Sequence, residues 1–252
     1  AAAAAALSAL ALVRQEPRSG VEAAALTPPP GLGESLRLLV RSSQSRWFAG
    51  FLLLAMFSYF VQDVILEPFG GEVFGLSAAS TARFNSYMGT GVILGMLAGG
   101  FWLIPRFGKQ RITALGCCLQ AGSFGLLAYA SAAGQAGWLS AAITLLGLGA
   151  GFFTVGGVAM MMDMTSAEHT GLFVGAWTLV QALAKGPAAI VGGALQTAFV
   201  NVGATAAQAY AGVFALEAVG IALSIFFLSR VGVQVFRKQV APLGSVVAEA
   251  MD

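Results

Sequence analysis

Six long apolar stretches constrain this chain more than any other feature of its sequence. Each is close to the roughly 20 residues that a helix needs to cross the hydrocarbon core of a bilayer. The chain is 58% hydrophobic and only 10% charged, far from the roughly 25% charged residues of a soluble domain. We therefore predict an all-α membrane protein, a bundle of six transmembrane helices. The predicted span cores are residues 47–65, 85–104, 112–131, 138–162, 172–199 and 208–228.

The segments outside these stretches complete the predicted organisation. Residues 1–13 are apolar, but about 20 Å of helix is too short for a ~30 Å hydrocarbon layer, so we expect the end of a preceding transmembrane helix. Residues 14–46 are polar and predict a cytoplasmic linker with an amphipathic segment. Residues 47–230 would then form the six-helix transmembrane domain, and residues 231–252 a cytoplasmic C-terminal tail.

The lysines and arginines predict how the spans are oriented. Of the 13 basic residues, all but Arg83 and Lys185 fall before the first complete span, between the second and third, or after the sixth. The positive-inside rule assigns such alternate segments to the cytoplasmic face. With six spans, both ends of the domain, including the C-terminus, would be cytoplasmic.

Glycines spaced four residues apart recur in three of the predicted spans. This spacing lets helix backbones approach closely. In lipid no hydrophobic effect acts between helices, so such close packing drives them to associate. Such glycines are common in membrane helices, but three sets favour a compact bundle. The sets are Gly91, Gly95 and Gly99 in the second span, Gly147 and Gly151 in the fourth, and Gly171 and Gly175 in the fifth.

Three carboxylates, Asp63, Glu67 and Glu72, lie where the first complete span is predicted to end. Asp63 and Glu67 are four residues apart and would share a helix face. The intervening Pro-Phe-Gly-Gly sequence disfavours helix and permits a sharp turn, which would bring Glu72 back toward the same rim. The acids then form either a site for a partner or ligand, or a turn whose carboxylates cap helix ends and meet water.

Two further charged residues lie about mid-way along predicted spans. Lys185 is in the fifth span, where a lysine costs roughly 2.5–3.5 kcal/mol, so we expect it to face protein or a cavity. Glu217, in the sixth span, is its predicted partner. This intramembrane pair would either fix the register of the two helices or belong to a ligand site.

The loop after the second span carries a cationic motif with Arg106, Gly108, Lys109 and Arg111. It resembles the cytoplasmic loop motif of the major facilitator superfamily, and a polar linker followed by six spans resembles the C-terminal half of that fold. Pro105 stands where the family usually has an acid, and the leading glycine is one position early. Because that acid helps to gate alternating access, its absence argues against ordinary transport.

Two longer stretches carry a narrower resemblance. Residues 62–75 read QDVILEPFGGEVFG, and residues 166–177 read SAEHTGLFVGAW, continuing through Gln181 to Lys185-Gly186-Pro187. Both are similar to the bacteriochlorophyll- and chlorophyll-delivery branch of the superfamily, the PucC-type light-harvesting complex assembly proteins. The resemblance implies handling or delivery of chlorophyll in a thylakoid or photosynthetic inner membrane. Photosystem or light-harvesting proteins would be the partners.

Chlorophyll is therefore the expected cofactor, with carotenoid or lipid as further candidates. Glu67 or the sole histidine, His169, would ligate its magnesium, since a neutral imidazole offers a lone pair. A capping or surface role for His169 in a short loop is the alternative. Asp63, Glu72 and Gln181 complete the set expected to contact pigment.

The sequence shows no Walker-type loop, no nucleophile elbow and no Cys/His metal spacing. We predict a protein that is not an enzyme and, with its basic residues confined to short loops, has no nucleic-acid partner. An assembly factor for photosynthetic complexes is the first hypothesis. The alternatives are a secondary transporter with a cavity lined by Asp63, Lys185 and Glu217, and a resident pigment-binding subunit of a photosystem.

Overall fold

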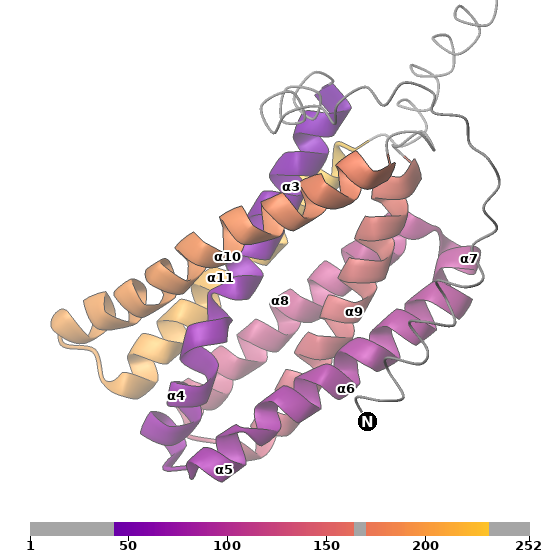
Figure 1. The fold of residues 1–252 in the computed structure, drawn as a ribbon. Coiled ribbons are helices and arrows are strands. Elements are labelled where there is room, and N and C mark those ends of the chain that lie inside the picture. Colours follow the sequence, from indigo (N-terminus) through magenta and orange to yellow (C-terminus); the bar gives the residue numbers. More distant parts are fainter. Residues whose placement is uncertain (1–42, 164–169, 232–252) are drawn as a thin grey trace, which may run out of the picture.

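A computed structural model describes residues 43–163 and 170–231. Every regular element in this part of the chain is helical, which confirms the predicted all-α class (Figure 1). The elements are α3 (Ser43–Phe60), α4 (Gln62–Phe74), α5 (Ala78–Thr81), α6 (Arg83–Ala98), the π-helix η1 (Gly99–Leu103), α7 (Ile104–Phe107), α8 (Lys109–Ala133), the 3-10 helix η2 (Ala136–Trp138), α9 (Leu139–Asp163), α10 (Thr170–Asn201) and α11 (Ala206–Ser229).

Within the described residues, six helical runs are long and apolar enough to cross a membrane, as predicted. Helices α3 and α4 together form the first run, and α5 to α7 form the second. The runs extend past several of the predicted apolar cores, because the helices continue into polar residues at their ends. Their bounds are Arg46–Phe74, Ala78–Phe107, Lys109–Ala133, Ala136–Asp163, Trp177–Asn201 and Ala206–Ser229.

The predicted turn within the Pro-Phe-Gly-Gly sequence is wrong, because α4 stays helical through Pro68 and ends only at Phe74. The turn lies at Gly75, whose φ of 64° is left-handed and whose N–H bonds back to the end of the helix. Gly70 is instead used for packing. A Cβ there would lie 2.7 Å from Thr81 Cγ2 and 2.8 Å from Phe84 Cε2.

The helices pack in an order that leaves two of them at the flanks. Helix α9 lies between α6 and α8, α11 packs on α8 and α3, and α10 lies on α3 and α11. In Figure 1, α10 and α11 are on one side of the molecule and α6 and α9 on the other. The spans containing α6 and α10 are the least buried, with 17% of each apolar window buried. These two helices therefore offer the most surface to lipid or to a partner.

The α6–α9 contact is backbone against backbone, as the glycine spacing predicts. A Cβ on Gly91 or Gly95 would overlap the carbonyl oxygens of Thr144 or Leu148, and a Cβ on Gly147 would overlap that of Met88. Small residues on both helices thus permit the close approach. Gly171 and Gly175 lie in the first turns of α10, and the close packing expected of them stays a prediction.

An aromatic cluster holds α4 against the rest of the bundle. The ring of Phe69 lies 4.9 Å from that of Phe214 and 5.4 Å from that of Tyr210, both on α11. Phe214 in turn stacks on Phe124 of α8 at 6.4 Å. All four side chains are buried. This cluster fixes the position of α4 and with it the direction of the three carboxylates.

Candidate functional site

An ion pair joins α4 to α10 within the predicted membrane region. Lys185 Nζ lies 2.8 Å from Asp63 Oδ2, and Gln62 Nε2 donates a 2.7 Å hydrogen bond to Asp63 Oδ1. The same ammonium group lies 5.2 Å from the centre of the Phe60 ring, a distance suited to a cation–π contact. Both oxygens of Asp63 therefore have a partner, and the charge of Lys185 is balanced.

The predicted Lys185–Glu217 pair is therefore wrong. Neither carboxylate oxygen of Glu217 has a hydrogen-bond partner among the described residues, and the residue is 3% exposed. The prediction failed because it placed Asp63 at the rim of the membrane. Helix α4 runs on to Phe74, so Asp63 lies about 16 Å before its end, where it can meet a lysine from the middle of α10.

Glu67 and Glu72 do not converge with Asp63 on one rim. Asn85 Nδ2 donates to Glu67 Oε1 at 3.0 Å, and the Tyr210 hydroxyl donates to Glu72 Oε2 at 3.0 Å. Because α4 is continuous, Glu72 points to a different side of the helix from Asp63 and Glu67. The three acids thus join α4 to α10, α6 and α11 respectively, and the predicted single cluster is not formed.

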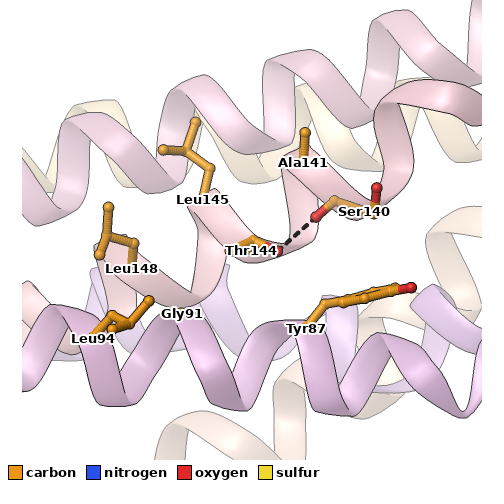
Figure 2. Close-up of a pocket in the computed structure, with 8 residues that line it drawn as sticks. All are labelled: Tyr87, Gly91, Leu94, Ser140, Ala141, Thr144, Leu145 and Leu148. Carbon is orange, nitrogen blue, oxygen red and sulfur yellow. Dashed lines mark hydrogen bonds between the residues drawn. The ribbon is translucent and has the colours of Figure 1, made fainter.

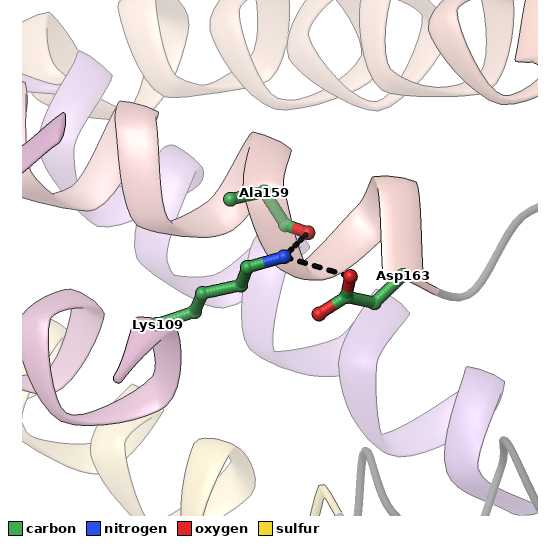
Figure 3. Close-up of polar contacts among 3 residues, drawn as sticks. All are labelled: Lys109, Ala159 and Asp163. Carbon is green, nitrogen blue, oxygen red and sulfur yellow. Dashed lines mark hydrogen bonds and ion pairs between the residues drawn. The ribbon is translucent and has the colours of Figure 1, made fainter. Parts of the chain in front are cut away.

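The cationic loop motif holds the ends of two other helices. Lys109 Nζ donates to Asp163 Oδ1 at 2.7 Å and to the Ala159 carbonyl at 3.3 Å (Figure 3). Gln110 Nε2 donates to the carbonyls of Leu228 and Val231 at 2.9 and 3.1 Å. The start of α8 is thereby tied to the ends of α9 and α11.

The remaining motif residues have other roles. Gly108 has a φ of 85°, which a residue with a side chain rarely adopts, so it makes the turn between α7 and α8. Arg106 and Arg111 are exposed. The parts played by Gln110 and Asp163 were not predicted, since nothing in a sequence shows which helix ends are neighbours.

A groove of about 460 Å³ runs between α6 and α9 (Figure 2). It falls within the roughly 300–1,000 Å³ of small-molecule sites. Its walls are mostly apolar, and the hydroxyls of Tyr87, Ser140 and Thr144 supply the polar groups, of which Thr144 Oγ1 donates to the Ser140 carbonyl at 2.8 Å. The sequence analysis missed this groove. The lining residues are Tyr87, Gly91, Leu94, Ser140, Ala141, Thr144, Leu145 and Leu148.

Three predicted pigment contacts remain predictions. His169 lies outside the described residues, and Gln181 is half-buried on α10, one turn before Lys185. Glu67 is exposed, and one of its oxygens accepts a hydrogen bond from Asn85. Among the described residues, no group of three or more His, Cys, Asp or Glu side chains could hold a metal ion.

These features define an all-helical, multi-pass membrane protein whose intramembrane charges join its helices. The chain belongs to the family described as PUCC protein, which it matches over residues 1–236. It is 35% identical over 169 residues to the bacteriochlorophyll synthase 44.5 kDa chain of Rhodobacter capsulatus, covering 65% of this chain and 39% of the relative. It is 30% identical over 220 residues to protein PucC of Cereibacter sphaeroides, covering 84% of this chain and 47% of the relative. The chain spans less than half the length of these curated relatives.

Proposed function

We propose that this protein acts in the assembly of photosynthetic complexes and binds or delivers chlorophyll-type pigment to a photosystem or antenna protein. The observation that carries the proposal is the match of residues 1–236 to the PUCC family. The printed name of one relative, a bacteriochlorophyll synthase chain, refers to the pigment itself. An assembly factor fits better than an enzyme, because Asp63, Glu67, Glu72 and Asp163 are used to join helices.

The α6–α9 groove is the proposed place for pigment in the described part of the chain. A chlorin ring with its hydrocarbon tail is largely apolar, and the groove runs along α6, which belongs to one of the two least buried spans. The hydroxyls of Tyr87 and Ser140 could donate hydrogen bonds to pigment carbonyls (Figure 2). A carotenoid or lipid tail would suit the same apolar walls.

Magnesium ligation by Glu67 would mark a different position. Glu67 bonds Asn85, which is two residues, or about 200°, away from Tyr87 around α6. A pigment held by Glu67 would therefore lie on another side of α6 from the groove. We retain Glu67 and His169 as alternative ligands, each testable by its own substitution.

We further propose that the six spans are the C-terminal half of a major facilitator fold, in a thylakoid or photosynthetic inner membrane. The loop motif at Lys109 and the distribution of lysine and arginine support this arrangement, with the C-terminus on the cytoplasmic side. The transporter alternative draws its support from Asp63, Lys185 and Glu217, all within predicted spans.

The test is to purify the full-length protein from a photosynthetic host in mild detergent and record its absorption. Bound chlorophyll is expected, and Ala141→Trp, which fills the groove, should lower the pigment-to-protein ratio at least several-fold. Ala222→Trp is the matched control, because Ala222 is exposed on α11, away from the groove. A protein without pigment, active in solute uptake, would favour the transporter, and stoichiometric comigration with mature photosystem would favour a resident subunit.

A further inference from the structure

Two buried side chains in the membrane region have polar atoms without partners. Glu217 is 3% exposed, and neither of its oxygens has a hydrogen-bond partner. Gln62 is fully buried; its amide nitrogen bonds Asp63, but its oxygen Oε1 has no partner. Within residues 43–163 and 170–231, these three oxygens are the buried side-chain atoms left unsatisfied. A buried polar atom without a hydrogen-bond partner destabilises a fold, so each of these oxygens needs a donor.

Helix packing brings the two residues to the same level. A Cβ on Gly220 of α11 would overlap Ser58 Oγ of α3, so the two helices touch at this point. The helices run in opposite directions (Figure 1). One turn further along the first span is Gln62, and one turn back along α11 is Glu217. Both unpartnered residues therefore lie on the contacting sides of the two spans, at the level where α4 begins.

The surrounding charges argue against an ionised Glu217. Asp63 and Lys185 neutralise each other, so a second carboxylate would add an uncompensated buried charge that Asp63 also repels. The other cations on the helices packed against α11 lie far from Glu217 along the bundle. Arg46 is 16 residues, or about 24 Å, before Gln62 in the first span. Lys109 and Arg111 flank Gln110, which bonds the carbonyl of Leu228, about 16 Å beyond Glu217 along α11. The remaining titratable groups on these helices carry no positive charge; they are Tyr59 on α3, Glu67 and Glu72 on α4, and Cys117, Cys118 and Tyr129 on α8.

We propose that Glu217 and Gln62 form a buried proton-binding site, in which the carboxyl of Glu217 carries a proton and donates it in a hydrogen bond to Gln62 Oε1. One proton satisfies the Gln62 oxygen and removes the buried charge at once. A metal ion is the poorer occupant, because it would need more oxygen ligands than these two side chains provide. The site is independent of pigment binding.

The site makes the α4–α11 contact dependent on a proton. When Glu217 is protonated, its carboxyl O–H donates to Gln62 Oε1, and both side chains have a hydrogen-bond partner. When the proton leaves, an ionised carboxylate faces an amide oxygen with no donor between them, and the two helices repel at that point. Proton occupancy would thus bias how tightly the first and last spans are packed.

Infrared spectroscopy of the full-length protein in lipid nanodiscs tests the site directly. At neutral pH we expect a C=O band from a protonated carboxylic acid, which Glu217→Gln abolishes. Glu67→Gln, which alters an exposed carboxylate, should leave the band in place. A band that survives in Glu217→Gln, or the absence of any such band with or without sodium, would overturn the proposal.

A second variant tests the part assigned to Gln62. Gln62→Leu removes the acceptor, so the same C=O band should remain but move to higher frequency as its hydrogen bond is lost. A band at unchanged frequency in Gln62→Leu would show that the proton is not shared with Gln62. Glu217→Gln is nearly isosteric, so a correctly folded protein is expected, and circular dichroism of each variant verifies it.

Discussion

Lys185 Nζ of α10 lies 2.8 Å from Asp63 Oδ2 of α4. The pair ties one of the two least buried spans to the first span, which the aromatic cluster around Phe69 anchors to the core. An unpaired Lys185 would be a costly charge in the membrane, so the lysine must lie next to an acid. Its pairing with Asp63 therefore helps to fix the position of α10 on the bundle.

A double-mutant cycle should detect this pair. Asp63→Asn and Lys185→Met should each destabilise the protein, and the double variant should lose less than the sum of the two. A coupling of about 1 kcal/mol is expected, measured by unfolding in mixed detergent micelles. The matched cycle of Glu217→Gln with Lys185→Met should show no coupling. Coupling in that second cycle instead would restore the original Lys185–Glu217 pairing.

The α6–α9 contact should tolerate no added side chain. Gly147→Ala would force its Cβ onto the Met88 carbonyl, and a loss of about 1–3 kcal/mol in unfolding free energy is expected. Gly122→Ala is the control, since nothing lies within 4 Å of a Cβ at that position. The control should be neutral or slightly stabilising. Equal losses in the two variants would contradict close backbone packing.

The Lys109–Asp163 contact should hold the ends of α8 and α9 together. Lys109→Gln removes the ion pair and weakens the bond to Ala159, so hydrogen exchange should become faster at the start of α8 and the end of α9. Arg111→Gln removes an equal charge at an exposed position and should leave exchange unchanged. If both variants accelerate exchange alike, net charge rather than this contact stabilises the helix ends.

The Tyr210 hydroxyl should stabilise the end of α4. Tyr210→Phe keeps the ring that packs on Phe69 but removes the donor to Glu72, for an expected loss of about 1–2 kcal/mol in unfolding free energy. Tyr129→Phe, at an exposed site on α8, should have little effect. In Glu72→Gln the effect of Tyr210→Phe should shrink, because a neutral acceptor makes a weaker bond. An undiminished effect there would mean that the hydroxyl acts elsewhere.

The number and type of elements could be predicted because spans in lipid follow from local composition. About 20 apolar residues in a row predict a helix wherever the rest of the chain lies, and the six spans were found near their predicted positions. Glycine spacing predicted close packing for the same reason, because it too is a local property. Gly147 has no side chain, so any helix packed against it can approach its backbone closely. The turn after Pro68 was wrong because local propensity there is overridden by the packing of Gly70 against Thr81 and Phe84.

The partners of the charged residues were decided by the tertiary structure alone. From the sequence, Lys185 had an acid in the neighbouring span, Glu217, and another in the first span, Asp63, with no local rule to choose between them. The choice depends on how far α4 extends and how α10 lies across it, which are properties of the packed bundle. The sequence by itself determined that this chain carries six apolar helical spans with costly intramembrane charges. Only the fold determined that Asp63 balances Lys185 and leaves Glu217 buried without a hydrogen-bond partner among the described residues.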